Sequence, residues 1–300
     1  MIQEFGSRWH DVLTGTGDEC TRAHGLPVVA LHCSGADARQ WRKLGAALGG
    51  AYDLLAVEFY GCESTGLWPG ERPFTLADEA RRVIDLIDAC GSRVHLVGHS
   101  YGGGVALRVA AERPQAIASL VLYEPSAFHL LSELGPRALG ARREILDLEQ
   151  AVSHGIVSGD YHGAARRFVD YWNGPGAWGA LQPEVRPALL RWLPKAPLDF
   201  RALLGERTPL AAYRGLAVPT LILRGEHARE PSRMIAEGLA HVIQGTRLSV
   251  IAGAGHMGPF THTAEVNQAI AAHLETAAAA NDIALPRGHS EKGRSGPLAA

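Results

Sequence analysis

Short apolar runs alternate with amphipathic segments along most of the chain. A continuous apolar run, as over residues 27–32, is typical of a strand buried on both faces, whereas apolar residues three and four positions apart are typical of a helix. On this basis strands are predicted over 27–32, 53–59, 94–97, 118–123, 220–224 and 247–251, and helices over 40–48, 75–89, 105–113, 231–239 and 264–274. Regular alternation of strand and helix predicts a mostly parallel sheet covered by helices on both faces.

The alternation stops in the middle of the chain. Residues 126–217 contain helical patches at 138–152 and 163–172 but no convincing strand. The stretch after these patches is interrupted by prolines at 175, 183, 187, 194 and 197. We therefore expect an α/β core built from residues 1–125 and 218–276, with a helical segment inserted over 126–217. Ile2–Trp9 and Asp11–Leu13 could form a hairpin. Residues 277–300 lack periodicity, which favours a flexible tail.

The stretch most suggestive of chemistry begins at the end of the 94–97 strand. It reads Gly98-His99-Ser100-Tyr101-Gly102 and runs into the predicted helix 105–113. A strand, a tight turn and a helix in this order would hold the Ser100 hydroxyl at the carboxyl end of the sheet, and the two glycines would let strand and helix cross closely. In this setting the G-x-S-x-G pattern resembles the nucleophile elbow of the α/β-hydrolase superfamily. The resemblance implies an α/β-hydrolase fold, a nucleophilic Ser100 and a helical cap over 126–217.

A serine nucleophile needs a base within hydrogen-bond reach. His256 lies in Ala252-Gly253-Ala254-Gly255-His256, a glycine-rich loop that follows the last predicted strand. The near-neutral pKa of histidine suits proton transfer. The position also resembles the histidine loop of the superfamily, so His256 is the expected base.

The carboxylate that orients the histidine has more than one candidate. The commonest pattern in the superfamily places an Asp in the loop after the 220–224 strand, but Ala228 stands there and no Asp occurs from 201 to 281. Glu124 ends the 118–123 strand, where haloalkane dehalogenases and certain lactone hydrolases carry their acid. Glu226 and Glu230 are the alternatives from the later loop. With any of these three glutamates, the catalytic residues follow the order Ser, Glu, His along the chain.

Two further groups of residues complete the expected site. The backbone N–H of Tyr101 and that of Ser34, in His32-Cys33-Ser34-Gly35, are the expected oxyanion donors by resemblance to the His-Gly-x turn of the superfamily. Cys33 replaces the usual glycine, and we interpret it as a small buried residue. Five aromatic side chains are candidates for substrate binding: Trp41, Phe168, Trp172, Trp178 and Trp192.

Composition narrows the possible partners. Lys and Arg total 29 against 31 acidic residues, so no basic surface for nucleic acid or an anionic membrane is indicated. The four cysteines lie far apart, no apolar run is long enough to span a bilayer, and the N-terminus lacks the features of a signal peptide. We expect a cytoplasmic protein that binds a small-molecule substrate. No metal or cofactor is predicted, because the phosphate-loop and dinucleotide fingerprints are absent.

These features together favour a serine hydrolase that cleaves a small, largely apolar carboxylic ester or lactone through an acyl-enzyme on Ser100. Similar enzymes use the same residues for C–C bond hydrolysis of a β-diketone or ring-fission product, which is the alternative reaction. A ligand-binding protein that has kept the fold without catalysis is the alternative of another class.

Overall fold

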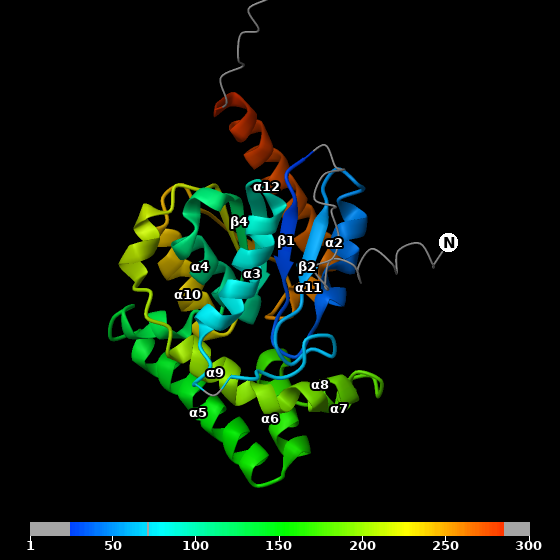
Figure 1. Cartoon of the computed structure of the whole chain (residues 1–300). Helices are drawn as coiled ribbons and strands as arrows, with labels where there is room; N and C mark the ends of the chain where they lie inside the picture. The colour runs from blue at the N-terminus through cyan, green and yellow to red at the C-terminus, as the bar shows by residue number, and fades with distance from the viewer. Residues whose placement is uncertain (1–24, 71, 285–300) are drawn as a thin grey trace, which may run out of the picture.

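The computed structural model describes residues 25–70 and 72–284. The hairpin expected within residues 2–13 lies outside these ranges. Six parallel strands form one sheet in the order β2-β1-β3-β4-β5-β6 (Figure 1). The strands are β1 (Val28–Leu31), β2 (Leu54–Val57), β3 (Val94–His99), β4 (Ile117–Tyr123), β5 (Thr220–Gly225) and β6 (Arg247–Ile251). All six correspond to predicted strands, so the predicted parallel sheet is confirmed.

Helices cover both faces of the sheet because its side chains alternate between two apolar layers. Val29, Leu96 and Ile222 lie in the larger core, with α3 (Leu76–Cys90), α4 (Tyr101–Glu112) and α10 (Glu230–Val242). Val28 and Val97 lie in the smaller core on the opposite face, with α2 (Arg42–Ala47) and α12 (Thr263–Ala284). Short elements connect these layers: η1 (Ala38–Trp41), η2 (Pro114–Ala116) and α11 (Gly258–Thr261).

Residues 126–217, all of which the structure describes, contain helices and no strand. These are η3 (Phe128–Ser132), α5 (Ala138–Val157), α6 (Tyr161–Asn173), α7 (Ala177–Ala180), α8 (Arg186–Trp192), η4 (Leu193–Lys195), α9 (Ala196–Leu204) and η5 (Leu210–Gly215). Helices α5 to α9 gather at one end of the sheet (Figure 1). Two of the prolines that we interpreted as interruptions instead lie at the start of helices. Pro187 and Pro197 occupy the first turns of α8 and α9, where the backbone N–H needs no partner within the helix.

The C-terminal prediction needs a correction. Helix α12 continues to Ala284, beyond the expected end near 276, and the Ala277 side chain is only 1% exposed. Residues 277–284 are therefore part of a helix rather than of a flexible tail. The alanine-rich composition that hid the helical period also favours helix strongly. Across the described ranges, no helix combines the length and apolarity needed to cross a bilayer.

Candidate active site

Ser100 occupies a sharp corner between β3 and α4. Its φ of 53° and ψ of −116° lie outside the regions that L-residues normally adopt. The crossing of strand and helix leaves no room for side chains at the flanking glycines. A Cβ added at Gly98 would lie 2.5 Å from the carbonyl oxygen of Gly102, and a Cβ added at Gly102 would lie 2.4 Å from the carbonyl oxygen of Leu31. The two glycines therefore permit the turn that presents the serine.

Ser100, His256 and Glu124 form a continuous hydrogen-bonded chain. His256 Nε2 lies 2.8 Å from Ser100 Oγ, and His256 Nδ1 lies 2.8 Å from Glu124 Oε2. All three residues are buried. Because an ionised carboxylate only accepts, Nδ1–H donates to Glu124, which leaves Nε2 free to accept the serine proton. This geometry lets the imidazole take a proton from the hydroxyl and keeps the resulting cation beside a carboxylate.

Of the three candidate glutamates, Glu124 is the one that contacts the histidine. Its second oxygen, Oε1, accepts the Gly225 N–H at 2.9 Å, so both carboxylate oxygens are used. Glu226 instead accepts the Gly253 N–H at 2.8 Å, and Glu230 lies 3.6 Å from Arg233 in an ion pair. The neighbouring strands β4 and β5 thus position the acid from the sheet rather than from the later loop.

The histidine loop has two supports that were not apparent from the sequence. His99 Nε2 donates to the His256 carbonyl at 2.9 Å, and its Nδ1 accepts from the Gln40 amide at 3.1 Å. Burial, and then the proximity of His256, holds the pKa of His99 well below its usual value, so His99 stays neutral. The Trp172 ring stacks on His256 with centroids 4.1 Å apart and planes inclined by 26°.

Of the two residues expected to supply oxyanion donors, Tyr101 directly follows Ser100 and Ser34 lines the same cavity as Ser100. Tyr101 is the first residue of α4, so its N–H has no carbonyl one turn earlier in its own helix. The Cys33 N–H donates to Gln40 Oε1 at 3.0 Å, whereas the Ser34 N–H has no hydrogen-bond partner among the described residues. Ser34 is therefore the available donor in this turn. Burial raises the pKa of the Cys33 thiol to about 12, consistent with a protonated, packing cysteine.

A small aromatic cavity adjoins Ser100. Its volume is about 20 Å³, which is enough for about one water molecule. The lining residues are Ser34, Ser100, Ser126, Phe128, Phe168, Trp172, Trp192, Ala196, Asp199, Phe200 and Leu203. Ser126 was not anticipated from the sequence; its Oγ lies 3.1 Å from Ser100 Oγ. Most of the wall comes from the helices between β4 and β5.

Two of the five aromatic candidates do not line this cavity. Trp41 is 1% exposed and packs in the smaller core with α2 and α12, on the opposite face of the sheet. Trp178 packs edge-on against His162, and the Arg186 guanidinium lies over its ring. The structure therefore does not bring Trp41 and Trp178 to the cavity beside Ser100, since sequence distance from a motif does not determine which face a side chain occupies. Phe168, Trp172 and Trp192 line the cavity.

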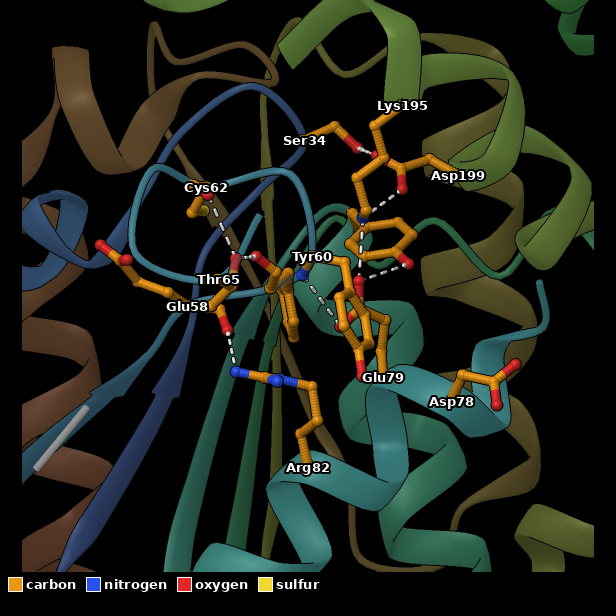
Figure 2. A network of polar contacts seen from close by, with 12 residues as sticks. Ser34, Glu58, Tyr60, Cys62, Thr65, Asp78, Glu79, Arg82, Lys195 and Asp199 are labelled. Carbon is orange, nitrogen blue, oxygen red and sulfur yellow. Dashed lines mark hydrogen bonds and ion pairs between the residues drawn. The ribbon is translucent and has the colours of Figure 1, made fainter. Parts of the chain in front are cut away.

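A buried polar network adjoins the cavity (Figure 2). Lys195 Nζ lies 2.9 Å from Glu79 Oε1 and 2.5 Å from Asp199 Oδ1. Burial acts to lower the pKa of Lys195, but the two carboxylates hold it above its usual value, so the amine stays charged. Burial raises the pKa of Glu79 despite the opposing effect of Lys195. In the sequence the only sign of this network is that Lys195 and Asp199 lie four residues apart, a spacing that is typical of ion pairs on an exposed helix face.

The chain is similar in sequence to several known proteins. The chain is 30% identical over 261 residues to polyketide synthase ThaQ of Burkholderia thailandensis, covering 84% of this chain and 12% of ThaQ. It is 35% identical over 129 residues to the putative carbamate hydrolase RutD of Variovorax paradoxus, covering 42% of this chain and 47% of RutD. The chain thus spans less than half the length of either relative.

A solved hydrolase from Pseudomonas aeruginosa PA01 superposes with a TM-score of 0.65 at 25% identity, covering 85% of this chain and 91% of that one. The model of the alpha/beta hydrolase family matches residues 28–269, which include the serine turn, the Glu124 strand end and the His256 loop. The chain therefore belongs to the alpha/beta hydrolase family.

Proposed function

We propose that the protein is a serine hydrolase that cleaves a small, largely apolar carboxylic ester or lactone. The observation that supports this most directly is the chain of two 2.8 Å hydrogen bonds from Glu124 through His256 to Ser100, beside an aromatic cavity. The named relatives include a putative carbamate hydrolase, another enzyme that cleaves a bond to a carbonyl carbon. Family membership supports hydrolysis, and the cavity supports the choice of substrate.

The proposed reaction has two halves. Ser100 Oγ attacks the carbonyl carbon as its proton passes to His256 Nε2, and the N–H groups of Tyr101 and Ser34 hold the resulting oxyanion. Collapse of the intermediate breaks the C–O bond, and His256 protonates the leaving alcohol. Water then loses a proton to His256 and attacks the acyl group, which releases the acid and restores Ser100. In a lactone, alcohol and acid belong to one product molecule.

The small cavity limits the substrate. The cavity volume of about 20 Å³ is far below the roughly 300–1,000 Å³ of typical ligand pockets, so we infer that its wall moves when a substrate binds. The wall that would move is formed by α6, α8 and α9, which contribute Phe168, Trp172, Trp192 and Phe200. A short acyl chain would displace the fewest of these side chains, which is why we propose a small substrate.

Turnover of p-nitrophenyl butyrate by the wild type and by Ser100→Ala tests the proposal. We expect hydrolysis by the wild type and a loss of at least about 10³-fold in kcat in the variant, because no other nucleophile replaces the hydroxyl. Ser153→Ala is the matched control, since the hydroxyl of Ser153 on α5 is also hydrogen-bonded to a side chain, Glu149 at 2.8 Å, but Ser153 is not among the residues that line the cavity. Wild-type cleavage of a β-diketone without ester or lactone turnover would instead support C–C hydrolysis. Binding of such ligands without any turnover would support a non-catalytic protein.

A further inference from the structure

The cluster of Glu79, Lys195 and Asp199 is almost completely enclosed. The exposed fractions of these side chains are 0%, 2% and 4%. Glu79 comes from α3 of the core, whereas Lys195 and Asp199 come from η4 and α9, between β4 and β5. The cluster therefore joins the inserted helices to the core beside the active site (Figure 2).

Stability alone is a weak reason for such a cluster. Removing charges from water costs several kcal/mol per ion, and well-packed apolar residues often stabilise a fold as effectively as a buried ion pair. The rings of Phe74 and Tyr101, with centroids 5.4 Å and 4.5 Å from Lys195 Nζ, show that apolar packing is available at this position. The contacts of the cluster suggest another role.

The cluster contacts the side chains of both residues whose backbone N–H groups are the expected oxyanion donors. Ser34 Oγ donates to Asp199 Oδ2 at 2.8 Å. The Tyr101 hydroxyl lies 3.5 Å from Glu79 Oε1, and Lys195 Nζ lies over the ring of the same tyrosine. Lys195 connects the two carboxylates (Figure 2). A continuous polar chain therefore runs from Ser34 to Tyr101.

We propose that Asp199 and Lys195 are positioning residues that hold the Ser34 N–H in the oxyanion hole, an inference that rests on the serine hydrolase function proposed above. Asp199 fixes the Ser34 side chain, Lys195 fixes Asp199, and Glu79 fixes Lys195 to the core. The inserted helices thus complete the oxyanion hole in addition to forming the cavity wall.

Ser34 needs this support more than Tyr101 does. Tyr101 is held by the backbone of α4, whereas Ser34 lies in a turn between β1 and η1, next to Gly35 with a φ of +74°. The peptide that carries the Ser34 N–H is held on one side at the Cys33 oxygen, which accepts the Ala36 N–H at 3.2 Å and lies 2.8 Å from His32 Nδ1, and on the other side by the bond from Ser34 Oγ to Asp199. An oxyanion donor acts only when it lies about 2.7–3.1 Å from the developing charge, so a small rotation of this peptide would weaken it.

Ser34→Ala removes the anchoring hydroxyl but keeps the N–H. We expect kcat for p-nitrophenyl butyrate to fall about 10-fold, part of the 10²–10³-fold cost of losing a donor outright, while KM changes less than about 2-fold. The inhibition constant of a trifluoromethyl ketone with the same propyl chain, which forms an oxyanion on Ser100, should rise by the same factor as kcat falls. Ser153→Ala is again the control and should match the wild type in both measurements.

The part played by Asp199 is tested by a double-mutant cycle. In Asp199→Asn the one remaining oxygen would pair with Lys195 Nζ, so Ser34 would face an NH₂ group instead of its carboxylate acceptor. We expect this change to lower kcat in the wild type but to have little further effect in Ser34→Ala, where the hydroxyl that bonds Asp199 is already absent. If Asp199→Asn does not fold, the inhibitor data for Ser34→Ala decide the matter alone. Wild-type kcat and inhibitor affinity in Ser34→Ala, an effect on KM only, or full additivity in the cycle would each overturn the proposal. An inactive wild type would refute the proposed function itself, and the positioning role with it.

Discussion

Ser100 and Glu124 share a conformation that few residues adopt. Among the described residues they are the only non-glycine positions with positive φ, 53° and 40°. Such conformations cost of order 1–3 kcal/mol and persist where the surroundings hold them. Here the Glu124 N–H donates to the Leu223 carbonyl at 2.9 Å and the Ser100 N–H to the Tyr123 carbonyl at 3.0 Å. The two strained residues are those whose side chains meet at His256.

The hydrogen bonds of Glu124 predict a large effect of a small substitution. Glu124→Gln replaces one acceptor by an NH₂ donor, although both Gly225 N–H and His256 Nδ1–H donate to this side chain. A histidine forced to accept at Nδ1 would carry its proton on Nε2, where it faces Ser100. We expect kcat for p-nitrophenyl butyrate to fall about 10³- to 10⁴-fold.

Glu226→Gln is the matched control for this substitution. Its amide oxygen can still accept the Gly253 N–H, so kcat should stay within about 2-fold of the wild type. Equal losses in the two variants would show that Glu124 has no special role in orienting the histidine.

At the scale of elements, the junction of β3 and α4 is a point of backbone contact between three segments. Gly102 in the first turn of α4 lies against the carbonyls of Leu31 and His32 at the end of β1. Its N–H donates to the His32 carbonyl at 3.1 Å. The helix is therefore seated directly on the neighbouring strand, which explains a glycine where helix propensity alone favours alanine.

Gly102→Ala and Gly140→Ala form a matched pair of helix substitutions. At Gly102 the new Cβ would lie 2.4 Å from a backbone oxygen, so we expect the free energy of unfolding to fall by about 1–3 kcal/mol. At Gly140 in α5 nothing lies within 4 Å, and we expect a gain of about 0.5–1 kcal/mol from helix propensity. Urea titrations measure both, and a loss of stability at Gly140 equal to that at Gly102 would contradict the argument.

At the scale of the whole molecule, buried neutral histidines couple folding to pH. Burial lowers the pKa of His32 and of His95 to about 4 and that of His99 well below its usual value. All three lie at or near the central strands β1 and β3. In the unfolded chain these groups titrate near pH 6.5, so below that pH the unfolded state binds more protons than the folded state.

The free energy of unfolding should therefore decrease as the pH falls. Above about pH 6.5 these histidines do not reduce the free energy of unfolding. As the pH falls from there towards 4, each of them lowers the free energy of unfolding by up to about 1.4 kcal/mol per pH unit. Urea unfolding at pH 7.5, 6 and 5 should show this decline. His95→Gln should reduce its slope, whereas His154→Gln, at an exposed position on α5, should leave it unchanged. A wild type whose stability is flat from pH 7.5 to 5 would refute the prediction.

Local sequence patterns predicted much of this protein because they reflect local physics. Apolar runs identified all six strands, two glycines identified the serine turn, and a glycine-rich loop identified His256. Helix ends were less predictable: prolines at the starts of α8 and α9 resembled breaks, and alanines concealed the end of α12.

Only the tertiary structure decided which distant groups meet. Glu124 and His256 lie 132 residues apart, and Ser34 and Asp199 lie 165 residues apart, so their pairing depends on how strands and helices pack. The same packing placed Trp41 in the core rather than at the cavity and enclosed Lys195, a residue type that is usually exposed. The sequence determined the elements and the candidate chemistry, because periodicity and turn preferences act over a few residues. Packing decided which glutamate contacts the histidine and which side chain contacts Ser34, because those contacts exist only once the sheet and the helices between β4 and β5 are assembled.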